Sequence, residues 1–253
     1  MKKLLLSIFS YILLALINLG CTNGESKIMN KAITIDFPLH GVWVTPNTPG
    51  KKIPSHGIDM YGETYAYDFV GVGENERTDK FYKISVISYL MNGARLEKCY
   101  GWGSEIYAPF DGEVISTEDG VTERNPVNVG NDLRYAIRIT KEFKSGKAEY
   151  KDIAGNYIIL KYSENVYALF AHMQKNSIEV KPGKKIKKGQ VLGKVGHSGN
   201  STAPHLHFQL MDNADPIESK GILCNFTNYE EFRNGKWIDI NNGIPSKYRI
   251  RNH

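Results

Sequence analysis

Apolar and polar residues alternate two apart through the middle of the chain, the pattern typical of half-buried strands. Five segments show it: 112–117, 135–140, 156–162, 166–172 and 205–210. Past the first twenty residues, no long segment has apolar residues at helical spacing. The pattern predicts one mainly β domain, a single antiparallel sheet or sandwich with long loops, a short groove and at most short helices.

Two segments, 71–102 and 118–156, interrupt this alternation and are rich in charged and turn-forming residues. We interpret them as excursions from a compact core, the second with hairpin arms around Lys144-Ser145-Gly146. Near the chain end, Asn234-Gly235 is a two-residue turn signal between apolar neighbours. It predicts a terminal hairpin.

The chain begins with two lysines and an almost uninterrupted apolar run from residue 4 to 19, which is typical of an export signal. An uncleaved anchor is the alternative. Gly20-Cys21 follows and resembles the lipobox of bacterial lipoproteins, although Asn18 departs from that box. The resemblance implies a lipid on Cys21 and hence membrane attachment, on the outer membrane or the periplasmic face; simple export is the alternative.

These features predict three parts: a signal peptide at 1–20, a lipid attachment site and polar tether at 21–31, and a domain at 32–253. Within the domain we expect a core at 55–212 and a C-terminal hairpin extension at 213–253. The net charge of +5 becomes +3 without the two signal lysines (5 − 2), a weak bias that suits anionic envelope polymers as well as nucleic acid.

Three cysteines are present. With Cys21 lipidated, Cys99 and Cys224 remain in an oxidising compartment, and we predict that they lie close enough to pair. Two free, buried thiols are the alternative.

Histidines gather at strand positions. His205 and His207 lie two apart in a predicted strand, so both imidazoles project from one face. His172 ends another apolar strand, and alternation places it on the face of residues 166, 168 and 170. Alone, a His-x-His pair is more typical of a polar surface ladder, and a strand-end histidine of a structural role. Their co-occurrence in one predicted sheet favours a site.

A fourth histidine, His56, precedes the aromatic strand 65–70, which carries Asp68 between Tyr67 and Phe69. A carboxylate buried there needs a metal, a cation or strong donors, whereas a solvated strand face is the alternative. Two histidines and a carboxylate with an open fourth position are typical of hydrolytic Zn²⁺. The remaining histidines, His40, His197 and His253, are assigned no chemistry; we interpret His197 as a solvated turn residue.

Three motifs occur in a fixed order: APFDGEV at 108–114, YALFAHM at 167–173 and GQVLGKVGHSGNSTAPHLHFQL at 189–210. With them, the chain resembles the lysostaphin-type zinc metallopeptidases, which cleave peptidoglycan peptides, over roughly residues 55–212. A weaker likeness of 181–189 to biotinyl and lipoyl carrier turns lacks the modifiable lysine at a hairpin tip.

The resemblance implies zinc ligation by His56, Asp68 and His207. The family places its first histidine and aspartate four residues apart, whereas Asp59 follows His56 by three residues and Asp68 by twelve. The aromatic strand around Asp68 resembles a variant group with its aspartate on that strand, so Asp68 is preferred and Asp59 is the alternative.

The resemblance also implies that His172 and His205 lie beside the attacking water and act in catalysis. The sequence therefore predicts a zinc-dependent endopeptidase of the cell envelope, acting on peptidoglycan stem peptides or cross-bridges through a metal-activated water, and no nucleic-acid partner. A catalytically silent binding or regulatory module of the same fold is one alternative. A zinc hydrolase acting on other proteins is another.

Overall fold

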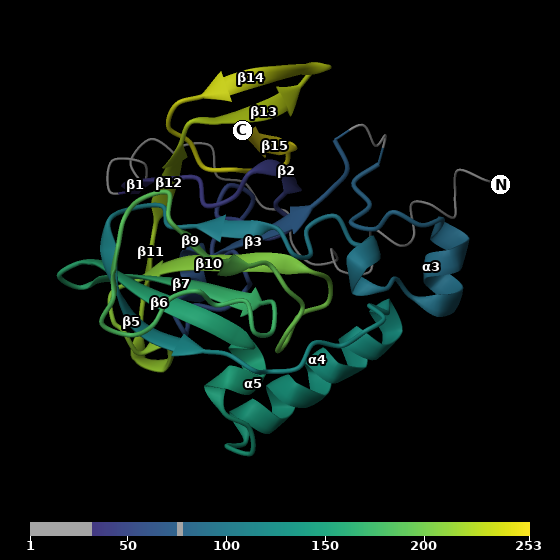
Figure 1. Cartoon of the computed structure of the whole chain (residues 1–253), viewed down its shortest axis with the longest axis horizontal. Coiled ribbons are helices and arrows are strands. Elements are labelled where there is room, and N and C mark those ends of the chain that lie inside the picture. Colours follow the sequence, from purple (N-terminus) through teal and green to yellow (C-terminus); the bar gives the residue numbers. More distant parts are fainter. Residues whose placement is uncertain (1–31, 75–77) are drawn as a thin grey trace. The chain divides into compact units, whose positions relative to one another are not determined.

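One large antiparallel sheet organises residues 32–74 and 78–253, which the computed structural model describes (Figure 1). Eleven strands form it, in the order β14-β13-β15-β2-β3-β10-β7-β6-β5-β8, with β11 paired to β10. Two short pairs lie outside it, β1 parallel to β12 and β4 antiparallel to β9. The predicted mainly β fold is confirmed.

The strands are β1 (Ile33–Asp36), β2 (Gly41–Val44), β3 (Tyr67–Gly71), β4 (Glu105–Tyr107), β5 (Gly112–Glu118), β6 (Asn156–Ser163), β7 (Val166–Met173), β8 (Lys185–Ile186), β9 (Val191–Lys194), β10 (His205–Met211), β11 (Gly221–Ile222), β12 (Cys224–Thr227), β13 (Tyr229–Arg233), β14 (Lys236–Ile240) and β15 (Ile250–Asn252). Four of the five predicted strands correspond to β5, β6, β7 and β10. The terminal hairpin is confirmed as β13–β14, where Asn234 and Gly235 take the positive φ angles, 51° and 79°, that a tight hairpin turn requires.

The central strands bury one face in the main core. Alternate residues of β3, β7 and β10 contribute large side chains there, among them Phe69, Phe170 and Phe208. The rings of Phe170 and Phe208 meet edge to face, 5.1 Å between centroids. The opposite face of β7 carries Leu169 and Ala171, which pack with Ala154 of the helical layer. The main core thus occupies one face of these strands, and the opposite face packs against the helical layer at Leu169 and Ala171.

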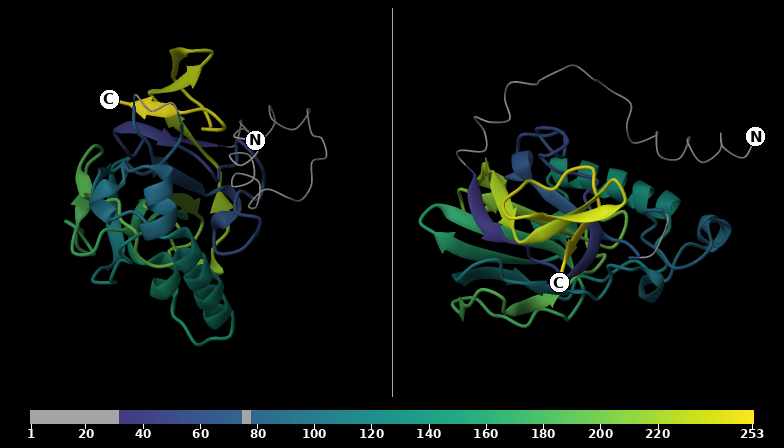
Figure 2. Two further views of the ribbon diagram at one scale, coloured as in Figure 1. Left: turned by 90° about the vertical axis from the view of Figure 1, so that its right-hand side faces the viewer. Right: turned by 90° about the horizontal axis from the view of Figure 1, so that it is seen from above.

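Helices are longer than the sequence predicted. They are α3 (Val86–Asn92), α4 (Val129–Lys144) and α5 (Tyr150–Ala154), with short 3-10 turns η1 (Glu63–Tyr65), η2 (Leu96–Lys98) and η3 (Pro216–Glu218). Helices α4 and α5 lie together beside the strands β6 and β7 (Figures 1 and 2).

The predicted strand at 135–140 and the hairpin around Lys144 are wrong, because residues 129–144 form α4. Asn128 caps this helix, its Oδ1 accepting from the backbone N–H groups of Gly130 and Asn131 at 3.1 and 3.2 Å. The two residues that α4 buries, Asp132 and Ile139, lie seven apart, at helical spacing. One of them is a carboxylate, so a search for apolar periodicity misses the buried face.

The predicted proximity of Cys99 and Cys224 is also wrong. Both cysteines are buried and free. Cys99 packs with Tyr82 and Tyr89 in a small separate cluster, whereas Cys224 lies on β12 in the main core. The segment 71–102 folds around its own aromatic core, which keeps the two thiols apart.

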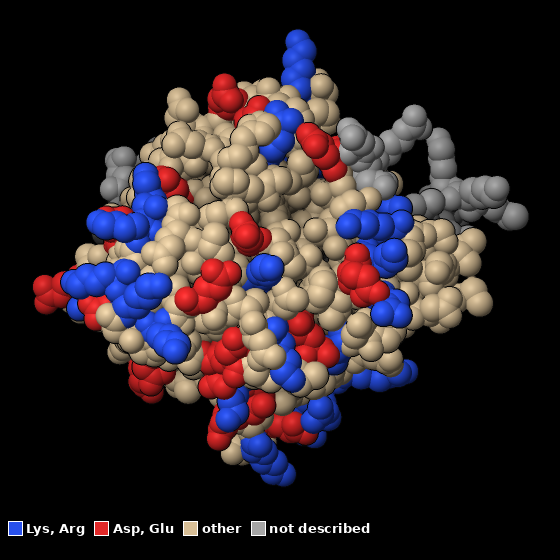
Figure 3. Space-filling view, viewed as in Figure 1, with Lys and Arg blue, Asp and Glu red and all other residues tan. Residues whose placement is uncertain are grey.

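The predicted signal peptide, the tether and Cys21 lie outside the described residues and stay predictions, as does the division of the domain at residue 212. Within the described ranges, no helix is both long and apolar enough to cross a membrane. Figure 3 shows lysine, arginine, aspartate and glutamate side chains interspersed on the face in view, without a large field of one sign.

Candidate metal centre and active site

The centre of the site lies on three neighbouring strands, β3, β10 and β7, whose residues stand directly opposite one another there. On β10, His207 pairs with Asp68 of β3 on one side and with Ala171 of β7 on the other. Residues directly opposite in an antiparallel pair project to the same face, so the imidazole and the carboxylate meet. His207 Nδ1 lies 3.0 Å from Asp68 Oδ1.

The loop before η1 brings His56 to the other carboxylate oxygen, with Nε2 3.0 Å from Asp68 Oδ2. One ligand atom each from His56, Asp68 and His207 lies within 4.8 Å of the other two. His205, on the same face of β10, places Nε2 3.4 Å from Asp68 Oδ1. Asp59 lies elsewhere: it is exposed and accepts a hydrogen bond from Thr64 Oγ1. The structure therefore gathers Asp68, not Asp59, with the two histidines.

His172 reaches this face through a β-bulge. The pairs Asn156–Met173 and Ile158–Phe170 enclose one more residue on β7 than on β6. At that point His172 has a φ of 61°, in the left-handed region that non-glycine residues seldom adopt. Strict alternation would direct its ring into the core beside Phe170. The expectation that His172 shares the face of residues 166, 168 and 170 is therefore wrong: it lines the site cavity instead, its ring 4.7 Å from that of His205.

Backbone carbonyls fix the tautomers of His172 and His205. His172 Nδ1 lies 2.9 Å from the carbonyl oxygen of Ser198, and His205 Nδ1 lies 2.7 Å from that of Ala203. A carbonyl oxygen only accepts, so Nδ1 carries a proton in both rings and Nε2 is the only ring nitrogen that can accept one. Burial, followed by the charges of neighbouring histidines, lowers the pKa of His172 well below its ordinary value. His172 is therefore a neutral imidazole able to accept a proton.

The central carboxylate is ionised. Burial raises the pKa of Asp68, but the charges of His56 and His205 and hydrogen bonds from the histidines outweigh it and hold the pKa well below its usual range. Burial lowers the pKa of His207, yet Asp68 outweighs that effect and raises it to about 9. The ionised carboxylate and the imidazole nitrogens are largely shielded from solvent and converge on one point. Such a set of donors suits a divalent cation with nitrogen and oxygen ligands.

A cavity of about 260 Å³ opens over these groups. Its walls include residues that the sequence analysis did not select: Asn47, Glu63, Tyr150, Ile153, Asn200 and Thr202. Asn47 Nδ2 donates to Asp68 Oδ2 at 2.7 Å, and burial raises the pKa of the Glu63 carboxyl. Glu63 lies in the sequence between the candidate ligands His56 and Asp68, and an acidic residue at such a position could have been selected as a site residue. Asn47 and Tyr150 lie in segments without any such signal.

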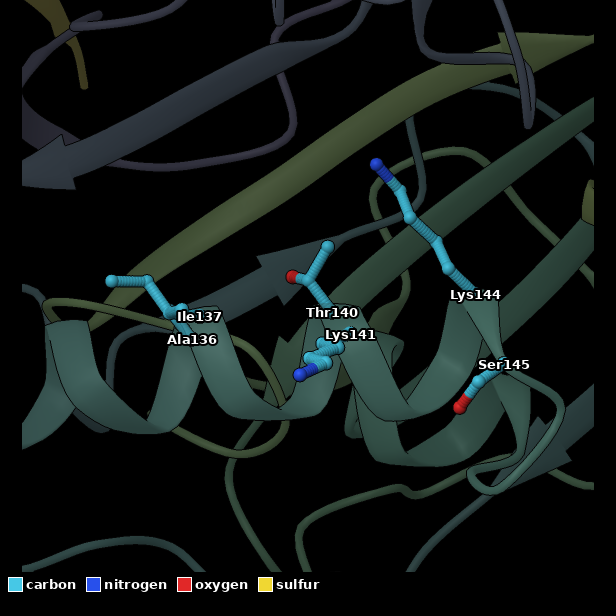
Figure 4. Close-up of a pocket in the computed structure, with 6 residues that line it drawn as sticks. All are labelled: Ala136, Ile137, Thr140, Lys141, Lys144 and Ser145. Carbon is cyan, nitrogen blue, oxygen red and sulfur yellow. The ribbon is translucent and has the colours of Figure 1, made fainter.

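Helix α4 forms one side of the cavity through Ala136. The same residue lines a second, open pocket of about 570 Å³ along the helix (Figure 4). In that view Thr140 and Lys144 point to the same side of α4, and the hydroxyl of Thr140 lies 3.3 Å from Asn200 Nδ2. The excursion at 118–156, in which a strand and a hairpin were wrongly predicted, therefore forms a wall of the site.

The interpretation of His197 as solvated is wrong as well. Its side chain is fully buried, with Nδ1 3.0 Å from Ser201 Oγ and Nε2 3.3 Å from Asp132 Oδ1. Arg124 completes this cluster: its Nε donates to Asp132 Oδ1 at 2.7 Å, and its other nitrogens donate to the carbonyls of Gly199 and Ser201. These contacts fasten α4 to the turn that leads into His205.

Residues 143–219 match the model of peptidase family M23. This segment is similar to the M23 peptidases. This confirms the resemblance predicted from the motifs. The match includes His172, His205 and His207, whereas the other two candidate residues, His56 and Asp68, precede it.

Two relatives are similar to part of this chain. The glycyl-glycine endopeptidase ALE-1 of Staphylococcus capitis is 40% identical over 88 residues, which are 35% of this chain and 23% of that protein. The peptidoglycan DD-endopeptidase ShyC of Vibrio cholerae is 34% identical over 67 residues, 26% of this chain and 15% of that protein. The match thus spans less than a quarter of either relative. Among solved structures, the catalytic domain of the prophage-encoded M23 protein EnpA from Enterococcus faecalis aligns with a TM-score of 0.38 and 21% identity, over 77% of this chain and 95% of that one.

Proposed function

We propose that the protein is a zinc-dependent endopeptidase that hydrolyses peptide cross-links of bacterial peptidoglycan. The convergence of five side chains in one cavity carries this proposal: His56, Asp68, His207, His172 and His205. The names of the relatives support the substrate, since one is a glycyl-glycine endopeptidase and another a peptidoglycan DD-endopeptidase.

His56 Nε2, Asp68 and His207 Nδ1 would hold the zinc ion. Two neutral imidazoles and one carboxylate leave the ion a net positive charge and an open position. When bound, Zn²⁺ lowers the pKa of a water molecule and polarises the scissile carbonyl. The buried carboxylate, which now collects three histidine contacts, supplies the negative charge that such an ion requires.

The chain's own groups move the proton. His172 is neutral and presents a free Nε2, so it accepts a proton from the attacking water and returns it to the amine that leaves. His205 lies between His172 and Asp68, where its Nε2 orients the water. The apolar wall of Leu169, Ala171 and Ala154 keeps bulk water from the reacting bond, which strengthens these polar interactions.

The test is digestion of isolated sacculi by purified residues 27–253. We expect soluble fragments with newly freed amino groups, loss of release after chelation, and recovery with added zinc. Mass spectrometry of the fragments identifies whether a direct or a bridged cross-link is cut. If the protein binds sacculi but releases no fragments, a catalytically silent binding or regulatory module is favoured. If it cleaves other proteins but not sacculi, peptidoglycan is not its substrate.

We propose further that Cys21 carries a lipid that anchors the enzyme to the envelope membrane. The apolar run ending in Gly20-Cys21 supports this. Labelled fatty acid should enter the full chain, and Cys21→Ala should abolish the label. Equal labelling of the variant would exclude this anchor.

A further inference from the structure

Gln209 contacts His207 on the side away from Asp68. The side chain is 1% exposed, and its Nε2 donates to the carbonyl oxygen of Tyr61 at 2.8 Å. Because that carbonyl only accepts, the amide is oriented with Oε1 toward His207 Nε2, at 2.9 Å. Oε1 also only accepts. Nε2 of His207 therefore carries a proton, and the lone pair of Nδ1 faces the centre once a cation replaces the proton between Nδ1 and Asp68.

Ser55 makes the equivalent contact to His56. The residue is fully buried, and its hydroxyl donates to the carbonyl oxygen of Glu63 at 3.1 Å. A serine has one hydroxyl proton, so the oxygen must accept from His56 Nδ1, which lies 3.0 Å away. Nε2 of His56, 3.0 Å from Asp68 Oδ2, is therefore the nitrogen whose lone pair is available once a cation replaces the proton between them.

Both chains of hydrogen bonds end on the short segment 61–63, between His56 and Asp68. Tyr61 and Gly62 have φ angles of 60° and 74°, which turn these carbonyls toward the site. A side chain at Gly62 would place its Cβ 2.5 Å from Gln209 Nε2, so the turn and the amide fit only with glycine there. The segment between His56 and Asp68 thus contains the two carbonyls that orient Gln209 and Ser55.

We propose that Ser55 and Gln209 are positioning residues that determine which ring nitrogen of His56 and of His207 faces the metal. The inference rests on the zinc site of the proposed function. Such outer partners fix the tautomer and orientation of a ligand, so their loss weakens metal binding without removing a ligand atom.

Zinc affinity measured by competition with a fluorescent chelator tests this proposal. We expect Gln209→Leu and Ser55→Ala each to bind zinc on the order of 10- to 100-fold more weakly than wild type. Ser55→Thr keeps the hydroxyl and should restore most of the affinity. Tyr229→Phe is the matched control, because it removes a buried hydroxyl contact to Glu231, outside the site cavity, and should leave affinity unchanged.

A second readout is independent of affinity. In the zinc-loaded wild type, long-range ¹H–¹⁵N spectra should show the proton on Nε2 of His207 and on Nδ1 of His56. The reverse assignment on either ring would overturn the proposal, as would wild-type affinity in both Gln209→Leu and Ser55→Ala. If the wild type binds zinc with this pattern but releases nothing from sacculi, the proposed function fails alone. No zinc binding by wild type overturns both.

Discussion

Two buried carboxylates sit in histidine-containing clusters, and they differ in what surrounds them. Asp132 accepts from Arg124 Nε, from a backbone N–H and from His197, and is 1% exposed. Asp68 faces three imidazoles and an asparagine amide, and it borders a cavity. A guanidinium permanently neutralises the first carboxylate, whereas the only positive charge beside the second comes from imidazoles, which can lose their protons. The Asp132 cluster is therefore structural, whereas the histidines around Asp68 can give up protons when a cation binds.

The largest effect is expected from Asp68→Ala, which removes one of three proposed ligands. Zinc affinity should fall by more than about 100-fold, beyond the usual loss from an outer partner, and hydrolysis should fall to background. Asp59→Ala is the matched control and should keep both properties. The zinc content of each purified variant reports metal binding, and the release of fragments from sacculi reports hydrolysis. If Asp59→Ala loses both while Asp68→Ala keeps them, the assignment of the carboxylate is wrong.

His172→Ala comes next, because it removes the proton acceptor but no ligand. We expect hydrolysis to drop by about 10²- to 10⁴-fold while zinc is retained. Initial rates and metal content, measured on the same preparation, separate the two roles. A parallel loss of zinc would instead make His172 a ligand.

Asp132→Ala should act on stability. It leaves Arg124 and His197 without their common acceptor, and breaking a buried pair in this way costs about 3 kcal/mol. Urea unfolding should show the loss in the free energy of unfolding. Below its unfolding midpoint the variant should retain its zinc. Loss of zinc from folded Asp132→Ala protein would show that the Asp132 cluster also supports metal binding and is not only structural.

The smallest effect is a pH dependence of stability from the Asp132 cluster. Burial lowers the pKa of His197, so below about pH 6.5 the unfolded chain takes up a proton that the folded state refuses, and stability falls. Burial raises the pKa of Asp132, but hydrogen bonds from His197 and Arg124 outweigh it and lower the pKa. The stability that Asp132 contributes is present above about pH 3.9 and is lost as the pH falls through its folded value.

The double variant Asp132→Asn with His197→Gln tests this pH dependence. Its free energy of unfolding, measured in chelator, should change less between neutral and acid pH than that of the wild type. Identical profiles would show that the cluster does not contribute.

The sequence predicted the strands that carry His205, His207 and Asp68, because alternation reports a half-buried sheet directly. It did not predict the face of His172, since a bulge shifts the alternation by one residue and depends on the neighbouring strand. Helix α4 was missed because its buried positions include Asp132, whose partners Arg124 and His197 are distant in sequence. Periodicity detects apolar burial, and these positions are stabilised by polar contacts instead.

The contacts of Arg124 limit how freely the helical segment can be exchanged. Segments outside the core of a fold are commonly treated as modules that can be exchanged. Here residues 118–155 contribute the guanidinium that donates to the carbonyls of Gly199 and Ser201, just before the His-x-His strand. A chimera with a replacement segment that lacks an equivalent arginine would remove this donor from both carbonyls. The segment and the turn are therefore expected to be inherited together, as one unit of exchange.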